Sequence, residues 1–391
     1  MKILIFGGAF DPPHKGHVSI LKKAIQYTDF DKVLVIPTGT PTHKNNCIAP
    51  FDVRLYMAKE AFGNIADNIE ICDYEGTSLK DNYTYLTLQY LQEKYDNPEI
   101  FMLIGSDSLI NLKTWKNSDD VIKNCTILAF ARKDKIDNIM QIEAEKLIQR
   151  GAKIHIIKND IVQASSSEYR EKILDNFNLN DILPENVNKI VIENKIYSND
   201  EIERLKFTSK LLAKLMLDEK RYQHTLNVEK LAVELGQIYH VNIDKLRISA
   251  LLHDILKYAP KHILLHRAQQ SGIMQNTHIK PLQTLHGFAA ADYAEKELKI
   301  KDQEILWALR SHTCGRSGMQ DIEKIIYLAD MLCAERKFDK KEYLLSIARD
   351  NLDKAMCECL KHSIEWVQSQ GNSVDSDSVQ ALEYFEKLLN S

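Results

Sequence analysis

The sequence predicts an α/β chain with a doubly wound parallel sheet, followed by a second domain made only of helices. Short apolar runs alternate with helical patterns through the first half, which is typical of parallel strands joined by crossover helices. Strand-like runs then disappear beyond about residue 200, at the polar stretch 198–200. The 391 residues are enough for two or more domains. We therefore expect one domain at 1–197 and another at 205–391.

The first half contains runs that predict buried strands. Each has four to six mostly apolar residues and stops at glycine, proline or a polar cluster; the runs are 3–6, 33–37, 69–72, 100–104, 125–130 and 153–157. Helical patterns lie between several of them. Because ligands bind at the carboxyl ends of strands in such sheets, residues that directly follow these runs are candidates for a site.

The stretch 7–17 follows the first strand and leads into a helix. Gly7 and Gly8 allow the backbone to approach a ligand closely. The first N–H groups of the following helix favour an anion. His14 and His17 are three residues apart, so a first helical turn places both on one side. Together these features predict a cradle for a triphosphate; the alternative is a turn with two surface histidines.

Further candidates follow later strands. His43 and Lys44 come after the second strand, and Gly105 and Asp107 follow the fourth. Within the segment 164–170, the serines at 165–167 stand just before another helical stretch, 169–176, where they are good N-caps. The functional alternative is a second phosphate site with serine hydroxyls, helix N–H groups and the cation of Arg170.

Taken in order, these stretches resemble the nucleotidyltransferases with a His-x-Gly-His motif, and specifically the nicotinate mononucleotide adenylyltransferases. The resemblance covers about residues 1–197, with departures at 82–84 and at Lys116. It implies transfer of AMP from ATP to nicotinate mononucleotide, giving deamido-NAD and pyrophosphate, with Mg²⁺ accompanying ATP. The catalytic residues it implies are His14, His17, Lys44 and Arg170, and the substrate-binding residues are Gly7, Gly8, Phe10, Thr84, Gly105, Asp107, Trp115, Ser165 and Ser166.

Composition narrows the class of protein. Apolar residues make up 44% and the net charge is −4, which predicts ordinary cores and gives no case for binding nucleic acid or an anionic membrane. No run reaches the roughly 18 apolar residues of a membrane span, and no signal peptide is recognisable. The 7 cysteines are odd in number and include no Cys-x-x-Cys pair, which fits a reducing cytoplasm. The sequence leaves a homo-oligomer open.

The second half predicts helices and a distinctive set of histidines and aspartates. Helical periodicity covers 211–217, 225–239, 245–256, 288–299, 303–311 and 321–334. Charged or imidazole side chains interrupt the apolar faces of this half or adjoin their helices: His224, His253, Asp254, His286, His312 and Asp330. A carboxylate within an apolar helix is costly unless it is paired or bound to metal. Core histidines with satisfied hydrogen bonds and capping aspartates are the alternative.

Imidazole and carboxylate ligands suit iron, manganese or zinc. Three or four such ligands hold one ion, so four histidines and two aspartates are enough for two ions if one carboxylate bridges them. Asp254 is the natural bridge. A two-metal site activates water and clamps phosphate oxygens.

The pattern resembles the HD phosphohydrolase superfamily, and more closely the bacterial YqeK-type proteins, which are di-iron hydrolases of diadenosine tetraphosphate. The resemblance covers roughly residues 205–370. It implies metal ligation by the six residues above, with iron as the metal, neutralisation of the polyphosphate by Lys257 and Arg316, and two ADP as products. Asp254 is then both a ligand and a catalytic residue.

Several alternatives stay open from the sequence. The helical half could hydrolyse another nucleotide, or it could be a non-catalytic nucleotide sensor that regulates the first half. It could also be an HD domain that acts on RNA or on a guanosine alarmone. The first half could transfer AMP to another phosphorylated acceptor such as phosphopantetheine, although that family usually carries threonine at the position of His14.

Overall fold

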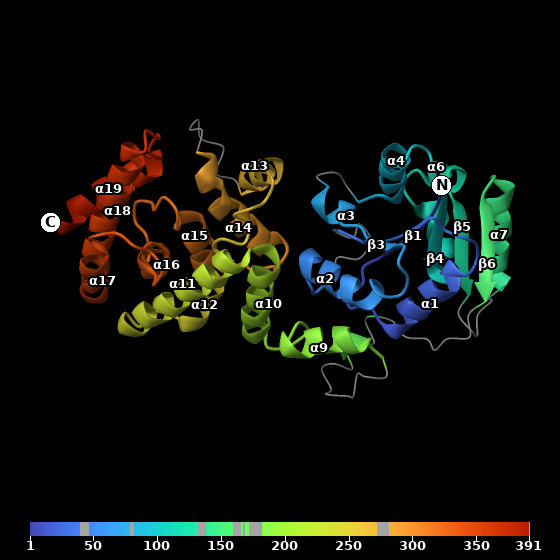
Figure 1. The fold of residues 1–391 in the computed structure, drawn as a ribbon, viewed down its shortest axis with the longest axis horizontal. Coiled ribbons are helices and arrows are strands. Elements are labelled where there is room, and N and C mark those ends of the chain that lie inside the picture. Colours follow the sequence, from blue (N-terminus) through green and yellow to red (C-terminus); the bar gives the residue numbers. More distant parts are fainter. Residues whose placement is uncertain are drawn as a thin grey trace. The chain divides into compact units, whose positions relative to one another are not determined.

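The computed structural model describes residues 1–39, 47–78, 82–131, 138–158, 166, 169–171, 182–271 and 281–390. The chain divides into two compact units, residues 1–199 and 200–391 (Figure 1). The first unit alternates strands and helices, and the described part of the second consists of helices and turns. Within the described residues, each helix is too short or too polar to cross a lipid bilayer.

A parallel sheet forms the centre of the first unit. Among the described residues it has six strands, in the order β3-β2-β1-β4-β5-β6, and all neighbours are parallel. This confirms the predicted doubly wound fold. The strands are β1 (Lys2–Gly8), β2 (Lys32–Pro37), β3 (Ile69–Ile71), β4 (Glu99–Gly105), β5 (Thr126–Ala131) and β6 (Lys153–Lys158).

The strand order reverses at β1, and this reversal positions the first site. β1 pairs with β2 on one side, with Gly8 opposite Pro37, and with β4 on the other, with Phe6 opposite Leu103. The carboxyl ends of these strands therefore meet at one edge. In open α/β sheets, ligands bind at such a switch point.

Helices cover both faces of the sheet because side chains alternate along each strand. Ile3 and Ile5 of β1 share a core cluster with Leu88 and Leu91, while Phe6 packs edge-on against Phe62 on the other face. The helices of this unit for which the structure gives bounds are α1 (Lys15–Ile25), α2 (Phe51–Phe62), α3 (Tyr74–Thr77), α4 (Thr84–Lys94), α5 (Ser106–Asn111), α6 (Ser118–Asn124), α7 (Asn138–Gln149) and α9 (Glu185–Glu193).

Aspartate and asparagine caps start many helices of the second unit. The Asp200, Asp218 and Asn242 side chains each accept a hydrogen bond from the first turn of the helix that follows. The described helices are α10 (Glu201–Met216), α11 (Glu219–Ile238), α12 (Ile243–Leu252), α13 (Lys261–Gln270), α14 (Leu285–Lys296), α15 (Gln303–Ser311), α16 (Asp321–Leu332), α17 (Lys341–Asp350), α18 (Leu352–Ser369) and α19 (Ser376–Leu389).

Helix α16 lies at the centre of the second unit. Its residues from Ile322 to Ala329 are all buried, and it packs against α11, α12, α15 and α18. A helix that is buried on all sides belongs to the middle of a core. Asp330, near its end, is thereby brought to the region where α11, α12 and α15 meet.

Several helix boundaries differ from the sequence prediction: α10 begins at Glu201 and not at 211, and two other differences concern site residues. His224 was expected to precede a helix that begins at 225, but α11 begins at Glu219 because Asp218 caps it, so His224 lies inside the helix. The helix expected over 245–256 ends at Leu252, with His253 as its C-cap. Both histidines therefore occupy different helical environments from those predicted. Helices α17, α18 and α19 were not predicted.

A buried arginine fixes the loops at the carboxyl ends of β1 and β2. Arg54, only 2% exposed, donates from Nη1 to the main-chain oxygens of Ala9 and Thr38, at 2.8 and 2.7 Å. It also donates to Gly39 O at 2.8 Å and Ala49 O at 3.1 Å. Since four carbonyl groups share one cation, the two loops are held as one body.

Glu75 lies beside this arrangement. Thr87 Oγ1 donates to Glu75 Oε1 at 2.9 Å. Burial raises the pKa of the Glu75 carboxyl to about 7, although hydrogen bonds from Thr87 and the Gly39 backbone and the charge of Arg54 oppose this rise. The folded state therefore retains a proton that the unfolded chain loses near its ordinary pKa.

We predict that Glu75 makes the first unit less stable as the pH rises. Between about pH 4.5 and about pH 7 the folded state binds more protons than the unfolded state, so stability falls with rising pH. In Glu75→Gln this dependence should be reduced, because the amide mimics the neutral acid. Thermal unfolding at about pH 5 and about pH 8 measures it; equal pH dependence in both proteins would contradict the prediction.

A close approach of α11 and α12 sets the position of the helix that carries His224. A Cβ placed on Gly236 would lie 2.2 Å from Leu246 Cδ1 and 3.1 Å from Ile243 Cδ1. A side chain at position 236 would therefore require the buried Leu246 to shift, whereas glycine, which costs about 1 kcal/mol relative to alanine in a helix interior, lets the two helices approach without a shift.

We predict that Gly236→Ala lowers the free energy of unfolding of the helical unit by about 1–3 kcal/mol, because overpacking outweighs the gain in helix propensity. Gln237→Ala, at the neighbouring exposed position of α11, is the matched control and should change stability by less than about 0.5 kcal/mol. Urea unfolding followed by circular dichroism measures both; a stabilised Gly236→Ala would refute the crossing argument.

Candidate functional site

The first candidate site is built on the N-terminus of α1. His14 is the N-cap, and His17 is three residues into the helix. The His17 backbone N–H donates to Nδ1 of His14, and the His14 N–H donates to Nδ1 of His17, both at 3.2 Å. The two rings stack with centroids 3.6 Å apart. Because each Nδ1 accepts a hydrogen bond, the neutral rings carry their proton on Nε2.

Gly16 makes this stacking possible. A Cβ at Gly16 would lie 2.9 Å from Nδ1 of His14, so the histidine ring occupies the space beside this glycine. Phe10 has a φ of +48°, in the left-handed region, and its buried ring packs against Phe62 and His17. The Phe10 side chain thus packs in the core beneath the loop and anchors it there. A contact of Phe10 with substrate would come from its backbone.

Asp11 joins the loop to three distant segments. Its carboxylate accepts hydrogen bonds from the backbone N–H groups of Ile48 and Ala49, and from the hydroxyl of Tyr197 at 2.7 Å. Arg170 Nη1 donates to the Asp11 main-chain oxygen at 2.7 Å. Burial, together with the Asp11 charge, raises the pKa of Tyr197 well above its usual range, so this hydroxyl stays a donor.

The structure brings several other predicted residues to this edge. Ser166 Oγ donates to the main-chain oxygen of Pro12 at 3.2 Å, so Ser166 and Arg170 both lie at the loop that follows β1. Gly7 is the next-to-last residue of β1, and Gly8 ends it. Lys44 and Ser165 lie outside the described residues.

The remaining predicted residues of this half surround β4. Gly105 ends β4 and is the N-cap of α5, and exposed Asp107 lies in the first turn of that helix. Half-buried Trp115 packs against the core cluster beyond α5. Thr84 is the first residue of α4. Arg54, which fixes the loops, was missed because a lone arginine in an amphipathic helix gives no sequence signal.

The second candidate site centres on the buried carboxylate of Asp254, which is 2% exposed. Its Oδ2 lies 3.4 Å from Nε2 of His253 and 3.8 Å from Nε2 of His224. Its Oδ1 lies 3.0 Å from Nε2 of His286 and 3.9 Å from Nε2 of His312. Each oxygen of Asp254 therefore faces its own pair of histidines.

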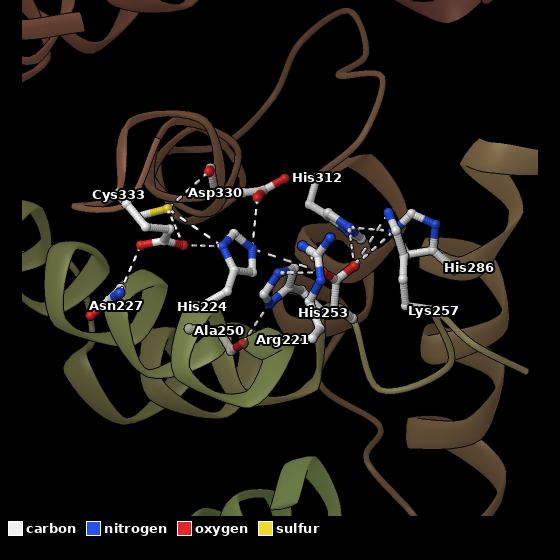
Figure 2. A network of polar contacts seen from close by, with 12 residues as sticks. Arg221, His224, Asn227, Ala250, His253, Lys257, His286, His312, Asp330 and Cys333 are labelled. Carbon is white, nitrogen blue, oxygen red and sulfur yellow. Dashed lines mark hydrogen bonds and ion pairs between the residues drawn. The ribbon is translucent and has the colours of Figure 1, made fainter. Parts of the chain in front are cut away.

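These residues come from separate helices that converge (Figure 2). His224 lies inside α11, His253 and His312 are the C-caps of α12 and α15, and His286 is the second residue of α14. Asp330 of α16 completes the group, with Oδ1 3.0 Å from Nε2 of His224. All six predicted ligands are thus brought together.

The electrostatics of this site favour a cation. Burial opposes ionisation of Asp254, but the charge and hydrogen bond of His253 hold the Asp254 pKa well below its usual range. Burial likewise opposes ionisation of Asp330, yet the His224 hydrogen bond and nearby positive charges keep its pKa low. Burial lowers the pKa of His312 to about 3 and also lowers that of His286. Burial opposes protonation of His253 as well, but the charge and hydrogen bond of Asp254 raise the His253 pKa. The site thus combines two carboxylates with imidazoles of two kinds, because His286 and His312 are held neutral and His253 is not.

The donor atoms fit divalent metal ions. His224, His253 and Asp254 form one group that could hold an ion, and Asp254, His286 and His312 form another, with donor atoms in each group within 4.8 Å of one another. The buried Nε2 atoms of His224 and His253 face carboxylate oxygens, at 3.0 Å from Asp330 Oδ1 and 3.4 Å from Asp254 Oδ2, but make no hydrogen bond of good geometry with any described residue. Such atoms are costly unless a cation or proton lies between them and the facing carboxylates.

Three cations contact this group. Arg221 Nη1 lies 2.9 Å from Asp254 Oδ2, and Lys257 Nζ lies 3.6 Å from Asp254 Oδ1. Arg336 Nη2 lies 2.7 Å from Asp330 Oδ1. Lys257 was predicted from the sequence, whereas Arg221 and Arg336 were missed. The available signal was their distance along the sequence from predicted ligands, since Arg221 lies three residues before His224 and Arg336 lies six residues after Asp330.

Arg316 has different partners from those expected. Its guanidinium donates twice to the buried carboxylate of Glu323, at 2.7 and 2.5 Å, and lies over the Trp307 ring at 4.5 Å. Glu323 also accepts from Ser311, the neighbour of His312. In this arrangement Arg316 fixes the turn that follows α15.

Comparisons with known proteins separate the two halves in the same way. Residues 5–172 match the cytidylyltransferase-like family model, and residues 221–335 match the HD domain model. A crystal structure from Clostridium acetobutylicum, described as a predicted HD superfamily hydrolase involved in NAD metabolism, is 31% identical; the match covers 46% of this chain and 96% of that one, with a TM-score of 0.44.

Two curated relatives are similar over long stretches. The "Probable nicotinate-nucleotide adenylyltransferase" of Fusobacterium nucleatum is 38% identical over 49% of this chain and 97% of its own length. The "Probable nicotinate-nucleotide adenylyltransferase/Ap4A hydrolase" of Mycoplasma genitalium is 28% identical over 92% of this chain and 97% of its own length. The chain therefore belongs to the nicotinate-nucleotide adenylyltransferase family, in the fused form in which an HD domain follows.

Proposed function

We propose that the first unit transfers AMP from ATP to nicotinate mononucleotide, forming deamido-NAD and releasing pyrophosphate. The observation that carries this proposal is the paired hydrogen bonding of His14 and His17, which leaves an Nε2–H on each ring at the N-terminus of α1. Two imidazole donors beside a helix N-terminus suit the phosphate chain of ATP. The family to which the chain belongs supports the choice of acceptor.

In the proposed reaction a phosphate oxygen of nicotinate mononucleotide attacks the α-phosphorus of ATP in line. The bond from the α-phosphorus to the bridging oxygen breaks, and pyrophosphate leaves with the electron pair. Such a transfer depends on positioning and charge neutralisation. The Nε2–H groups of His14 and His17 donate to oxygens that gain charge, and Arg170 and Lys44 neutralise the phosphates.

The other predicted residues have supporting roles in this proposal. Gly7, Gly8 and Gly105 admit the nucleotide close to the backbone, and Ser165 and Ser166 hydrogen-bond ATP. Thr84, Trp115 and Asp107 contact the nicotinate or ribose side. Mg²⁺ accompanies ATP and supplies neutralisation of its phosphate charge.

We predict that His17→Ala lowers kcat for deamido-NAD formation by about 10²–10³-fold, because one preorganised donor to the developing charge is lost. His155→Ala, an exposed histidine of β6 in the same unit, is the control and should retain full activity. Product formation from ATP with nicotinate or nicotinamide mononucleotide measures both the rate and the preference for the acid. Activity of His17→Ala within about threefold of wild type would refute the assigned role.

We propose further that the second unit is a two-metal phosphohydrolase that cleaves diadenosine tetraphosphate symmetrically into two ADP. The carrying observation is that the two oxygens of Asp254 face separate pairs of histidines. A carboxylate shared in this way suits two ions, one held with His224, His253 and Asp330 and the other with His286 and His312. The name of the Mycoplasma genitalium relative supports the substrate.

The proposed metal is iron, and the ions would activate water and neutralise phosphate charge. The chain itself supplies the remaining cations. Arg221 and Lys257 now contact Asp254, and both side chains are partly exposed, at 24 and 31%. They can turn toward a polyphosphate, since two ions would take over the neutralisation of Asp254.

We predict that Asp254→Ala abolishes formation of ADP from diadenosine tetraphosphate and leaves adenylyl transfer unchanged in the same preparation. Asp339→Ala, an exposed aspartate of the same unit, is the control. Separation of the products from iron-loaded protein measures the reaction. ATP plus AMP as products would mean that a different phosphorus is attacked, and metal binding without turnover would favour another nucleotide or the sensor alternative.

A further inference from the structure

The four histidines of the helical site hold their second ring nitrogen in two different ways. In three of them Nδ1 contacts the main-chain oxygen three residues earlier, at 2.6 Å for His253, 2.8 Å for His286 and 2.8 Å for His312. His253 and His312 are C-caps, and the last carbonyls of a helix have no partner within the helix. The chain therefore orients the rings of His253 and His312 with carbonyl groups that are left over at helix ends, and that of His286 with a carbonyl that precedes α14.

His224 cannot use this device. It lies well inside α11, where the carbonyls of the first turns already accept the hydrogen bonds of the helix. Its Nδ1 instead contacts Oε1 of Glu335, which belongs to the segment after α16. A side chain that is 111 residues away in the sequence thus takes the place of the local carbonyl.

Glu335 is itself held in place. Asn227 Nδ2 donates to Glu335 Oε2 at 2.7 Å, and Cys333 Sγ donates to Glu335 Oε1 at 3.1 Å. Asn227 lies three residues after His224, on the same side of α11. Figure 2 shows Asn227 and Cys333 on the side of His224 that is remote from His286. Both oxygens of Glu335 therefore have a donor besides the imidazole.

We infer that Glu335 is a positioning residue for the metal site: it accepts the Nδ1–H of His224 and so directs the Nε2 lone pair toward Asp330 and Asp254. A carboxylate behind a histidine ligand fixes the tautomer and raises the basicity of the ring. Glu335 thereby makes His224 a stronger ligand than the three histidines held by neutral carbonyls. This inference rests on the proposed two-metal site.

An alternative is that His224, Cys333 and Glu335 hold a further cation of their own, since their donor atoms also lie within 4.8 Å of one another. The observed contacts favour hydrogen bonding. Cys333 Sγ donates both to Glu335 and to the main-chain oxygen of Asp330, at 3.1 and 3.2 Å. An ion at Nδ1 would also require His224 to bind metal through both ring nitrogens.

The test is a titration of metal-free, full-length protein with Co²⁺ in competition with a chelator, followed by visible absorption. Glu335→Ala should weaken binding of one Co²⁺ by about 10–100-fold and alter its absorption spectrum, while the second Co²⁺ binds as in wild type. The Co²⁺ affinity of Glu335→Gln should lie between those of wild type and Glu335→Ala, because the amide oxygen of glutamine still accepts from Nδ1 of His224 but carries no charge. Glu342→Ala, at an exposed position of α17, is the matched control.

The outcomes separate the inference from the proposal beneath it. Wild-type affinity in both Glu335 variants would overturn the positioning role and leave the two-metal site standing. Asp254→Ala serves as the control that lacks the metal site. If wild type bound no more Co²⁺ than this variant, the metal site and the inference would be overturned together. An additional Co²⁺ with a thiolate-to-metal absorption band, lost in Cys333→Ser, would replace the inference by the third-cation alternative. Thermal unfolding of the metal-free variants runs in parallel; if Glu335→Ala is unfolded, Glu335→Gln decides.

Discussion

Unpaired backbone groups at helix ends determine the protonation pattern of the imidazoles in both sites. At the N-terminus of α1 the unpaired groups are N–H donors, so Nδ1 of His14 and His17 accepts and Nε2 carries the proton. At the C-termini of α12 and α15 they are carbonyls, so Nδ1 of His253 and His312 donates and Nε2 presents a lone pair. One kind of end yields Nε2–H donors, which the proposed function assigns to phosphate, and the other yields Nε2 lone pairs, which it assigns to metal.

The same constraint explains why one histidine of the helical site, His224, is oriented by a side chain from outside its own helix. His224 has no helix end near it, and the chain supplies Glu335 instead. Asp254 is ionised although it is buried, and this is stable only because histidines, Arg221 and Lys257 surround it. The first unit also contains a buried charge, that of Arg54, but there the charge is stabilised by hydrogen bonds to the main-chain carbonyl groups of the loops that Arg54 fixes.

The sequence allowed prediction of the fold class and of the six residues that meet around Asp254, because apolar periodicity and the spacing of chemical groups are local properties. Local pattern failed where a distant or capping contact decides. The start of α11 depends on the cap Asp218, and so the position of His224 within the helix was predicted wrongly. Apolar periodicity gave no signal for Arg54, Arg221 or Glu335, because each of them contacts a residue that is distant in the sequence.

The contact between Asp11 and Tyr197 bears on where the two halves of this chain can be joined. Tyr197 lies just before the end of the first unit at residue 199, yet its hydroxyl fills the buried side of the loop that carries His14. A gene fusion that trimmed the first unit before Tyr197 would remove the shorter of the two hydrogen bonds that Oδ1 of buried Asp11 accepts, and would leave only the Ala49 N–H on that oxygen. We therefore expect the joint between the halves to vary after this tyrosine and before the cap Asp200, so that insertions are tolerated more readily at 198–199 than a few residues earlier.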